Sequence, residues 1–148
     1  MTRIVAGSAK GRTLAVPKSG TRPTSERVRE ALFSRLDHMN VLEGAVVLDL
    51  YAGTGALGLE ALSRGAATAT LVEKASGAAR VATSNVRSTG LNARVVTADA
   101  RAYLAARSGQ VLSGEVDLVF IDPPYDIAEV DMTAVLEGLA PWIGPDAL

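Results

Sequence analysis

The stretch Val46-Val-Leu-Asp-Leu-Tyr-Ala-Gly-Thr-Gly-Ala-Leu-Gly-Leu-Glu60 decides the fold of this chain of 148 residues. Its β-branched start predicts a buried parallel strand, and the leucine-rich run after it predicts a helix. Gly53, Gly55 and Gly58 match the pattern G-x-G-x-x-G, which provides a tight turn, close approach of a ligand and close packing of helix on strand. The stretch therefore predicts a ligand-binding loop, and by itself it fits a nicotinamide dehydrogenase as well.

The rest of the chain repeats this strand-then-helix unit. Strands are expected near residues 46–51, 69–73, 94–98 and 116–121, and a further helix at 132–140. Such alternation predicts an α/β fold: a Rossmann-like, largely parallel, doubly wound sheet with helices on both faces. Ligands bind such sheets at the carboxyl ends of the strands. Four acidic residues fall at these ends, namely Asp49, Glu73, Asp99 and Asp122.

Asp49 argues against the dehydrogenase. It lies inside the end of the first strand, four residues before Gly53, where a dinucleotide fold normally has an apolar residue. A buried anion there suits a cationic group, such as the ammonium and sulfonium of S-adenosylmethionine, and suits a pyrophosphate badly. Glu73, at the end of the next strand, is placed to bind ribose hydroxyls in either kind of enzyme.

The segment Asp122-Pro123-Pro124-Tyr125 follows the apolar run of the fourth strand. Proline has a fixed φ and no N–H, so we expect the Pro123 carbonyl to point outward as an acceptor beside the Asp122 carboxylate. Two acceptors next to an aromatic ring can hold an exocyclic amino group and stack its base. The alternatives are that the segment is only a strand-ending turn and that Tyr125 packs in the core.

Together these segments resemble the successive motifs of class I S-adenosylmethionine-dependent amino-methyltransferases. Residues 7–14 (GSAKGRTL) and 22–33 (RPTSERVREALF) further resemble the RsmD family, bacterial enzymes that methylate guanine N2 in 16S ribosomal RNA. The resemblance extends from Arg3 to about Trp142. It implies that the chain transfers a methyl group from S-adenosyl-L-methionine to guanine 966 of 16S rRNA, free or in an assembling small ribosomal subunit.

The resemblance also implies functional roles for particular residues. The expected catalytic residues are Asp122, Pro123, Pro124 and Tyr125, and the expected cofactor-binding residues are Asp49, Tyr51, Gly53, Thr54, Gly55, Gly58, Glu73, Lys74, Asp99 and Ala100. Three of the cofactor-binding residues have other interpretations. Tyr51 is also suited to the core, Asp99 to capping a helix at 100–108, and Glu73 to being a plain surface acid.

The N-terminal region predicts a separate basic element. Residues 3–6 and 12–16 are expected to form a hairpin around a glycine-rich loop, followed by a connector, so that 1–23 precede a methyltransferase domain at 24–148. A helix capped by Thr24 or Ser25 should follow, with an apolar stripe of Val28, Ala31, Leu32 and Leu36 and with its arginines exposed.

Charge is divided unevenly along the chain. Residues 1–37 hold eight Lys or Arg and three acids, a balance of +5, whereas the remainder has seven basic and thirteen acidic residues, a balance of −6. A basic arm on an acidic body suits contact with RNA phosphates, although a solvated surface is the plainer alternative. The expected RNA-binding residues are Arg3, Lys10, Arg12, Arg22, Arg27 and Arg29.

Composition sets further expectations. The chain has no cysteine, its single histidine is expected to be structural or solvated, and no apolar run is long enough to span a membrane. We therefore expect a cytoplasmic, metal-free enzyme, by default a monomer. The alternatives are an amino-methyltransferase of adenine N6 in DNA or of a protein amide, and an rRNA-binding assembly factor without activity. We also expect a further strand after Asp146, so the native chain would continue past Leu148.

Overall fold

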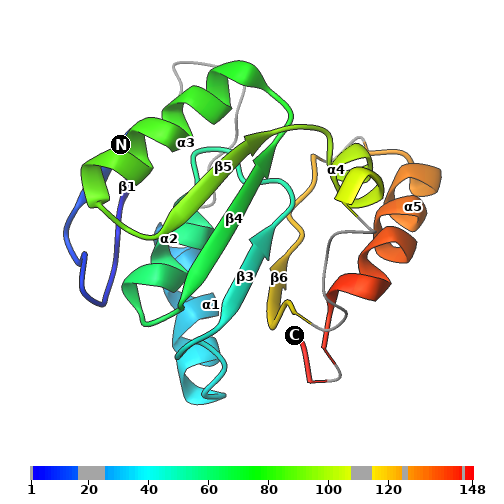
Figure 1. Cartoon of the computed structure of the whole chain (residues 1–148). Helices are drawn as coiled ribbons and strands as arrows, with labels where there is room; N and C mark the ends of the chain where they lie inside the picture. Colours follow the sequence, from blue (N-terminus) through cyan, green and yellow to red (C-terminus); the bar gives the residue numbers. More distant parts are fainter. Residues whose placement is uncertain (1, 17–25, 108–114, 125–126, 145) are drawn as a thin grey trace.

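A parallel sheet in the order β5-β4-β3-β6 forms the centre of the molecule (Figure 1). The computed structural model describes residues 2–16, 26–107, 115–124, 127–144 and 146–148. Its strands are β1 (Thr2–Arg3), β2 (Thr13–Leu14), β3 (Val46–Asp49), β4 (Thr68–Glu73), β5 (Ala93–Thr97) and β6 (Leu118–Phe120). Its helices are α1 (Glu26–His38), α2 (Ala56–Ser63), α3 (Ser76–Thr89), α4 (Ala100–Arg107), α5 (Glu129–Leu139) and the 3₁₀ turn η1 (Ala140–Trp142). The predicted fold class is confirmed.

The central strand β3 fixes which residues meet at the carboxyl edge of the sheet. It pairs in parallel with β4 on one side and β6 on the other, so that Asp49 lies opposite Leu71 and Phe120. Glu73 and Asp122 each come two residues after those partners. The parallel register therefore brings three carboxylates from distant parts of the chain to one edge.

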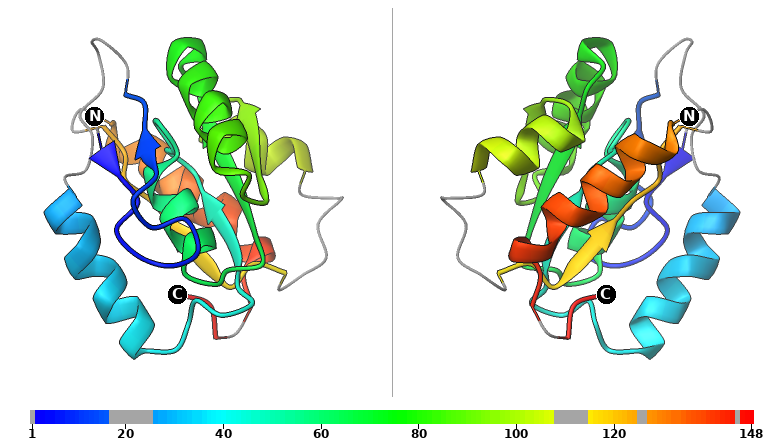
Figure 2. Two further views of the ribbon diagram at one scale, coloured as in Figure 1. Left: turned by 90° about the vertical axis from the view of Figure 1, so that its left-hand side faces the viewer. Right: turned by 90° about the vertical axis from the view of Figure 1, so that its right-hand side faces the viewer.

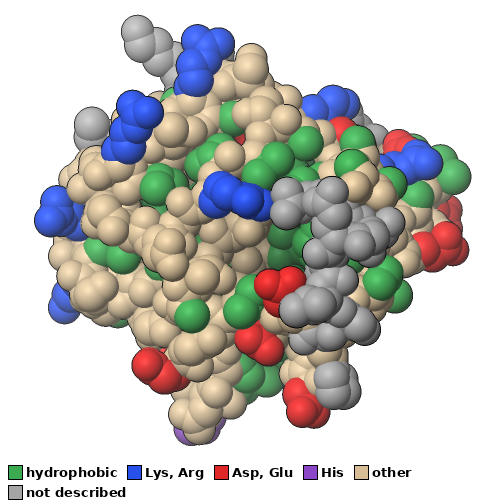
Figure 3. All heavy atoms as spheres, viewed as in Figure 1, with side chains coloured by type: hydrophobic (Ala, Val, Ile, Leu, Met, Phe, Trp, Pro, Cys, Tyr) green, Lys and Arg blue, Asp and Glu red, His purple; other side chains and the backbone are tan. Residues whose placement is uncertain are grey.

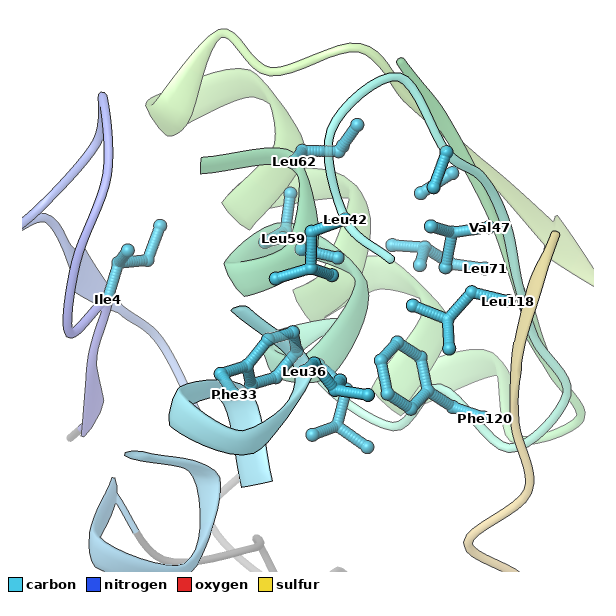
Figure 4. Close-up of a cluster of buried hydrophobic side chains, with 14 of the residues drawn as sticks. Ile4, Phe33, Leu36, Leu42, Val47, Leu59, Leu62, Leu71, Leu118 and Phe120 are labelled. Carbon is cyan, nitrogen blue, oxygen red and sulfur yellow. The ribbon is translucent and has the colours of Figure 1, made fainter. Parts of the chain in front are cut away.

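Alternating residues of the strands build a core on each face of the sheet. Val47 and Leu71 pack with α1 and α2 on one face, while Leu48 and Val72 pack with α4 and α5 on the other. Figure 4 shows the first core, in which Phe33 of α1 and Phe120 of β6 approach each other with ring centroids 5.6 Å apart. Within the described ranges, no helix has both the length and the hydropathy needed to cross a membrane.

The predicted apolar stripe of α1 is confirmed at Leu36 and wrong at Val28 and Leu32. Its buried residues are Arg29, Phe33 and Leu36, whereas Val28 is 58% and Leu32 is 36% exposed. The apolar residues alone favoured a stripe through Val28 and Leu32. The face of the helix that carries Arg29 is instead turned toward the protein interior, because α2 provides a buried partner for this arginine. The expected caps Thr24 and Ser25 lie outside the described residues.

That partner is Glu60, whose side chain is fully buried. Its carboxylate accepts hydrogen bonds from the Val5 N–H (2.9 Å) and the Ala6 N–H (3.1 Å) of the hairpin, and forms ion pairs with Arg29 (3.2 Å) and Arg64 (2.9 Å). Charge-assisted hydrogen bonds of this kind are about twice as strong as neutral ones. Glu60 thus fastens the N-terminal hairpin and α1 to α2.

The hairpin formed by β1, β2 and the loop between them lies across α2 (Figure 2). Its apolar residues Ile4 and Leu14 are buried in the same core as Phe33. At Gly7 (φ +88°), an added Cβ would collide with the backbone of Ser63, so the loop requires glycine at this contact. The predicted hairpin is present, and it is packed into the body of the protein.

The C-terminal residues lie along the outer edge of β6. Val116 forms a parallel bridge with Ile143, the Leu148 N–H donates to the Asp117 carbonyl (3.0 Å), and the Val119 N–H donates to the Leu148 carbonyl (2.8 Å). Leu148 therefore takes the position of a residue in a neighbouring parallel strand.

We predict that Glu60→Gln lowers the free energy of unfolding by about 3–5 kcal/mol, because it leaves a buried arginine without its counter-charge. Chemical denaturation measures the loss, and the exposed Glu137→Gln on α5 is the matched control, expected to stay within about 0.5 kcal/mol of the parent. Equal stability of the two variants would contradict the role given to Glu60.

Candidate functional site

A cavity of about 1450 Å³ opens at the carboxyl edge of the sheet. It runs from the loop between β3 and α2, past the ends of β4 and β5, to the segment after β6. Predicted site residues that line it are Tyr51, Gly53, Thr54, Glu73, Lys74, Asp99, Ala100, Asp122, Pro123 and Pro124. The structure thus brings together ten residues that come from four separate strand ends.

The glycine loop is held in a shape open to a ligand. Gly53 and Gly55 have positive φ values of 56° and 86°, and a Cβ built at Gly53 would meet nothing within 4 Å. The Gly53 N–H donates to Oε1 of Glu73 (2.8 Å), whose Oε2 accepts from the Ala75 N–H (2.7 Å). Glu73 therefore shapes the loop, and each of its oxygens retains a lone pair that can accept from a ribose hydroxyl.

Gly58, by contrast, does not belong to the cavity wall. A Cβ at this position would lie 2.3 Å from a methyl carbon of Leu71 in β4. This glycine permits close packing of α2 on the sheet, which is the structural role that the motif assigns to its third glycine. Gly55 is also buried, with Leu71 3.0 Å from its built Cβ. Both support the loop from behind.

Asp49 lies beneath the loop with its side chain fully buried. Oδ1 accepts from the Tyr51 N–H at 3.3 Å, and Oδ2 has no hydrogen-bond partner among the described residues. Burial raises the pKa of Asp49 from 3.8 to about 7; the nearby carboxylates of Asp122 and Glu73 add to the rise, and the Tyr51 N–H opposes it. A cationic group in the cavity would lower the cost of ionising this carboxyl.

Residues at the ends of β4 and β5 also line the cavity. Asp99 accepts from the Ala102 N–H (3.2 Å) and so caps α4, as one of its two interpretations predicted. Tyr51 lines the cavity and also packs against the second core, so its core interpretation is confirmed and its contact with a cofactor stays a prediction. Burial raises the pKa of Tyr51, with the carboxylates of Asp99 and Asp131 adding to the rise.

The segment after β6 forms the remaining wall. Asp122, Pro123 and Pro124 line the cavity, and the Pro124 carbonyl accepts from the Ile127 N–H (3.2 Å). The three residues thus lie at the cavity, and their predicted catalytic role stays a prediction. Tyr125 lies outside the described residues, and its stacking role stays a prediction.

Sequence reasoning missed the part of the cavity between α4 and α5. Ile127, Ala128 and Val135 line it, and an ion pair between Arg101 and Asp131 (2.9 Å) joins the two helices there. These residues belong to no recognisable sequence motif, and they reach the cavity only because α5 packs against α4. Among the described residues, no group of three or more His, Cys, Asp or Glu side chains is arranged to hold a metal ion.

The basic residues of the N-terminal region divide into two kinds. Arg3, Lys10, Arg12 and Arg27 are exposed. Arg29 is not: it is fully buried, pairs with Glu60 and also donates to the Thr2 hydroxyl and the Arg3 carbonyl. The expectation that it offers its charge to RNA is therefore wrong, because its guanidinium is enclosed. Arg22 lies outside the described residues.

The charges are unevenly distributed over the surface as well as along the chain. In the view of Figure 3, Lys and Arg side chains predominate along the top and left, Asp and Glu side chains predominate in the lower part, and both kinds occur at the upper right.

The fold and this site define a class I methyltransferase. A family model described as conserved hypothetical protein 95 matches residues 2–148. Ribosomal RNA small subunit methyltransferase D of Escherichia coli is 41% identical over 148 residues, covering 99% of this chain and 71% of that protein. The chain therefore belongs to the RsmD family, as the sequence motifs predicted.

Solved structures agree with this assignment. The Escherichia coli protein yhhF superposes with a TM-score of 0.82 at 37% identity, covering 99% of this chain and 76% of that one. The Thermus thermophilus protein TTHA0928 superposes with a TM-score of 0.80 at 36% identity, covering 95% of this chain and 80% of that one.

The raised pKa of Asp49 predicts a pH-dependent stability of the ligand-free protein. In the unfolded chain Asp49 ionises near pH 4, whereas the folded protein holds the proton up to about pH 7. Across that window the folded state binds more protons, so the free energy of unfolding falls as pH rises. We predict that Asp49→Asn removes this part of the decline and makes the ligand-free protein more stable than the parent at pH 8.

Urea denaturation at pH 5 and pH 8 tests this prediction, with the exposed Asp146→Asn as control. The difference between the two pH values should shrink in Asp49→Asn by a few kcal/mol at most and stay unchanged in the control. A parallel loss in all three proteins would show that Asp49 ionises normally.

Proposed function

We propose that this protein transfers the methyl group of S-adenosyl-L-methionine to the exocyclic N2 amino group of a guanine in 16S rRNA of the small ribosomal subunit. The observation that carries the proposal is one cavity with two different walls. The glycine loop, backed by the buried Asp49, forms one wall, and Asp122-Pro123-Pro124 forms the other. The name of the relative in Escherichia coli supports small-subunit rRNA as the substrate.

The first wall fits S-adenosylmethionine by charge and shape. Gly53 leaves open space in front of its backbone, and Glu73 retains acceptor capacity for ribose hydroxyls. Asp49 has a buried carboxyl oxygen without a partner among the described residues, and a cationic ligand group in the cavity would stabilise its ionised form. When bound, the cofactor supplies a methyl group on a positively charged sulfur.

The second wall fits an amino group. The lone pair of an exocyclic amine is conjugated with its ring, and the nitrogen becomes positively charged as it bonds to the methyl carbon. An acceptor at Asp122, with the Pro123 carbonyl beside it, would favour the nucleophilic form and stabilise that charge in the transition state. The nitrogen–carbon bond would form as the carbon–sulfur bond breaks, and the nitrogen would then lose one proton to solvent. The protein would further accelerate transfer by holding the amine nitrogen, the methyl carbon and the sulfur in line.

The exposed arm residues Lys10 and Arg12 give the RNA phosphates a place to bind. They lie on the hairpin that crosses α2, which begins directly after the glycine loop. Phosphate contacts position the nucleic acid, and the cavity selects the base. To reach the cavity, the target guanine has to leave its stack, as for other enzymes that modify bases.

We predict that Asp122→Ala lowers methyl transfer by at least about a hundredfold while leaving cofactor affinity nearly unchanged, because it removes a transition-state acceptor. Calorimetry with S-adenosylhomocysteine measures binding, and incorporation of labelled methyl into 16S rRNA measures transfer. Asp122→Asn keeps one acceptor oxygen and should retain more activity. Full activity of Asp122→Ala would refute the role of Asp122, and a failure of the unaltered protein to bind the cofactor product would refute the proposed function.

We predict that neutralising Lys10 and Arg12 together weakens RNA binding and reduces the slope of log affinity against log salt by about two, because fewer counterions are released. Filter binding at several salt concentrations measures this slope. The exposed Arg94→Ala on β5 serves as the control. If the slope stays the same in the double variant, the arm is only a solvated surface.

A further inference from the structure

Asn85 connects three segments of the chain inside the protein. It lies in the last turns of α3 and is only 2% exposed. Its side-chain N–H groups donate to the Thr54 carbonyl (2.9 Å) and the Ala15 carbonyl (3.0 Å), and its side-chain oxygen accepts from the Ala15 N–H (2.8 Å). Both amide hydrogens and the amide oxygen are therefore engaged.

The segments that Asn85 joins belong to the two halves of the proposed function. Thr54 lies between the positive-φ glycines of the loop and lines the cavity. Ala15 directly follows β2, the second strand of the basic hairpin. Arg12 of the same hairpin donates to the Ser88 carbonyl on α3 (3.3 Å), one turn beyond Asn85. The buried amide of Asn85 thus lies between the hairpin, which is proposed to bind RNA, and the glycine loop, which is proposed to bind the cofactor.

Only an amide of this length satisfies all three groups. A carbonyl accepts and an N–H donates, so the orientation of the side chain is fixed by its partners. Aspartate would place a carboxylate oxygen against two carbonyls, and alanine would remove the side-chain partner of the Ala15 backbone and of the buried Thr54 carbonyl. Other anchors of the hairpin lack this connection: Ser63 accepts from the Ala9 N–H (2.9 Å) and donates to the Ala6 carbonyl (2.6 Å), but does not reach the loop.

We infer that Asn85 is a positioning residue that couples RNA binding at the hairpin to cofactor binding at the glycine loop. RNA bound to the hairpin restricts the movement of Ala15, which bonds the amide of Asn85, and that amide bonds the Thr54 carbonyl of the glycine loop. By linkage, the cofactor strengthens RNA binding by the same factor. The inference rests on the proposed function and adds the route by which the two ligands affect each other.

A thermodynamic cycle tests this coupling. The dissociation constant of S-adenosylhomocysteine is measured with and without saturating protein-free 16S rRNA, for the parent, Asn85→Ala and Ser63→Ala. We expect the RNA to tighten binding at least about fivefold in the parent and in Ser63→Ala, and less than about twofold in Asn85→Ala. A residue that only stabilises the fold would lower the melting temperature without changing this ratio.

The outcomes separate the coupling from the proposed function. If the parent binds both ligands and the ratio is near one, or if Asn85→Ala keeps the ratio of the parent, the inference is overturned. If the parent binds neither ligand, the proposed function fails first. Should Asn85→Ala not fold, hydrogen exchange on the parent decides: 16S rRNA alone should slow exchange at residues 53–56, and unchanged exchange there overturns the coupling.

Discussion

The parallel pairing of β3 with β4 and β6 is the constraint on which the rest of the structure depends. It places Asp49 opposite Leu71 and Phe120, and the chain then needs only two further residues on each neighbour to reach Glu73 and Asp122. A shift of one residue in either pairing would turn those side chains to the other face of the sheet. The two cores prevent such a shift, because Val47 and Leu48 already fill opposite faces. The geometry of the site is therefore a consequence of how the core is packed.

Buried polar side chains hold the N-terminal hairpin against the body of the protein. Glu60 and Asn85 lie on different helices, and each forms hydrogen bonds to backbone groups of the N-terminal hairpin or of the residue directly after it. A hydrophobic contact could hold the hairpin in place without fixing its register, whereas hydrogen bonds of defined direction fix both. The cavity and the basic hairpin are in this way held next to each other.

The sequence was sufficient to predict the fold, the glycine loop and the acidic strand ends, because strand periodicity and glycine spacing are local signals. It failed where the outcome depends on a distant partner. Arg29 has the composition of an exposed helix residue, and only the burial of Glu60 across the α1–α2 contact explains its position. Asn85 carries no motif, and its role becomes visible only when Ala15 and Thr54 lie on either side of it. Val28 was assigned to the core for the same reason that Arg29 was assigned to solvent: polarity alone does not show which face of a helix has a partner.

The proposed function is tested most directly by the identity of the methylated group. Protein-free 16S rRNA and small-subunit particles are incubated with the protein and S-adenosylmethionine carrying an isotopically heavy methyl group, and the RNA is digested to nucleosides for mass analysis. The expected product is heavy N2-methylguanosine. Heavy N6-methyladenosine, or label found only on ribosomal protein, would show that the cavity receives a different amino group and would contradict the proposed function.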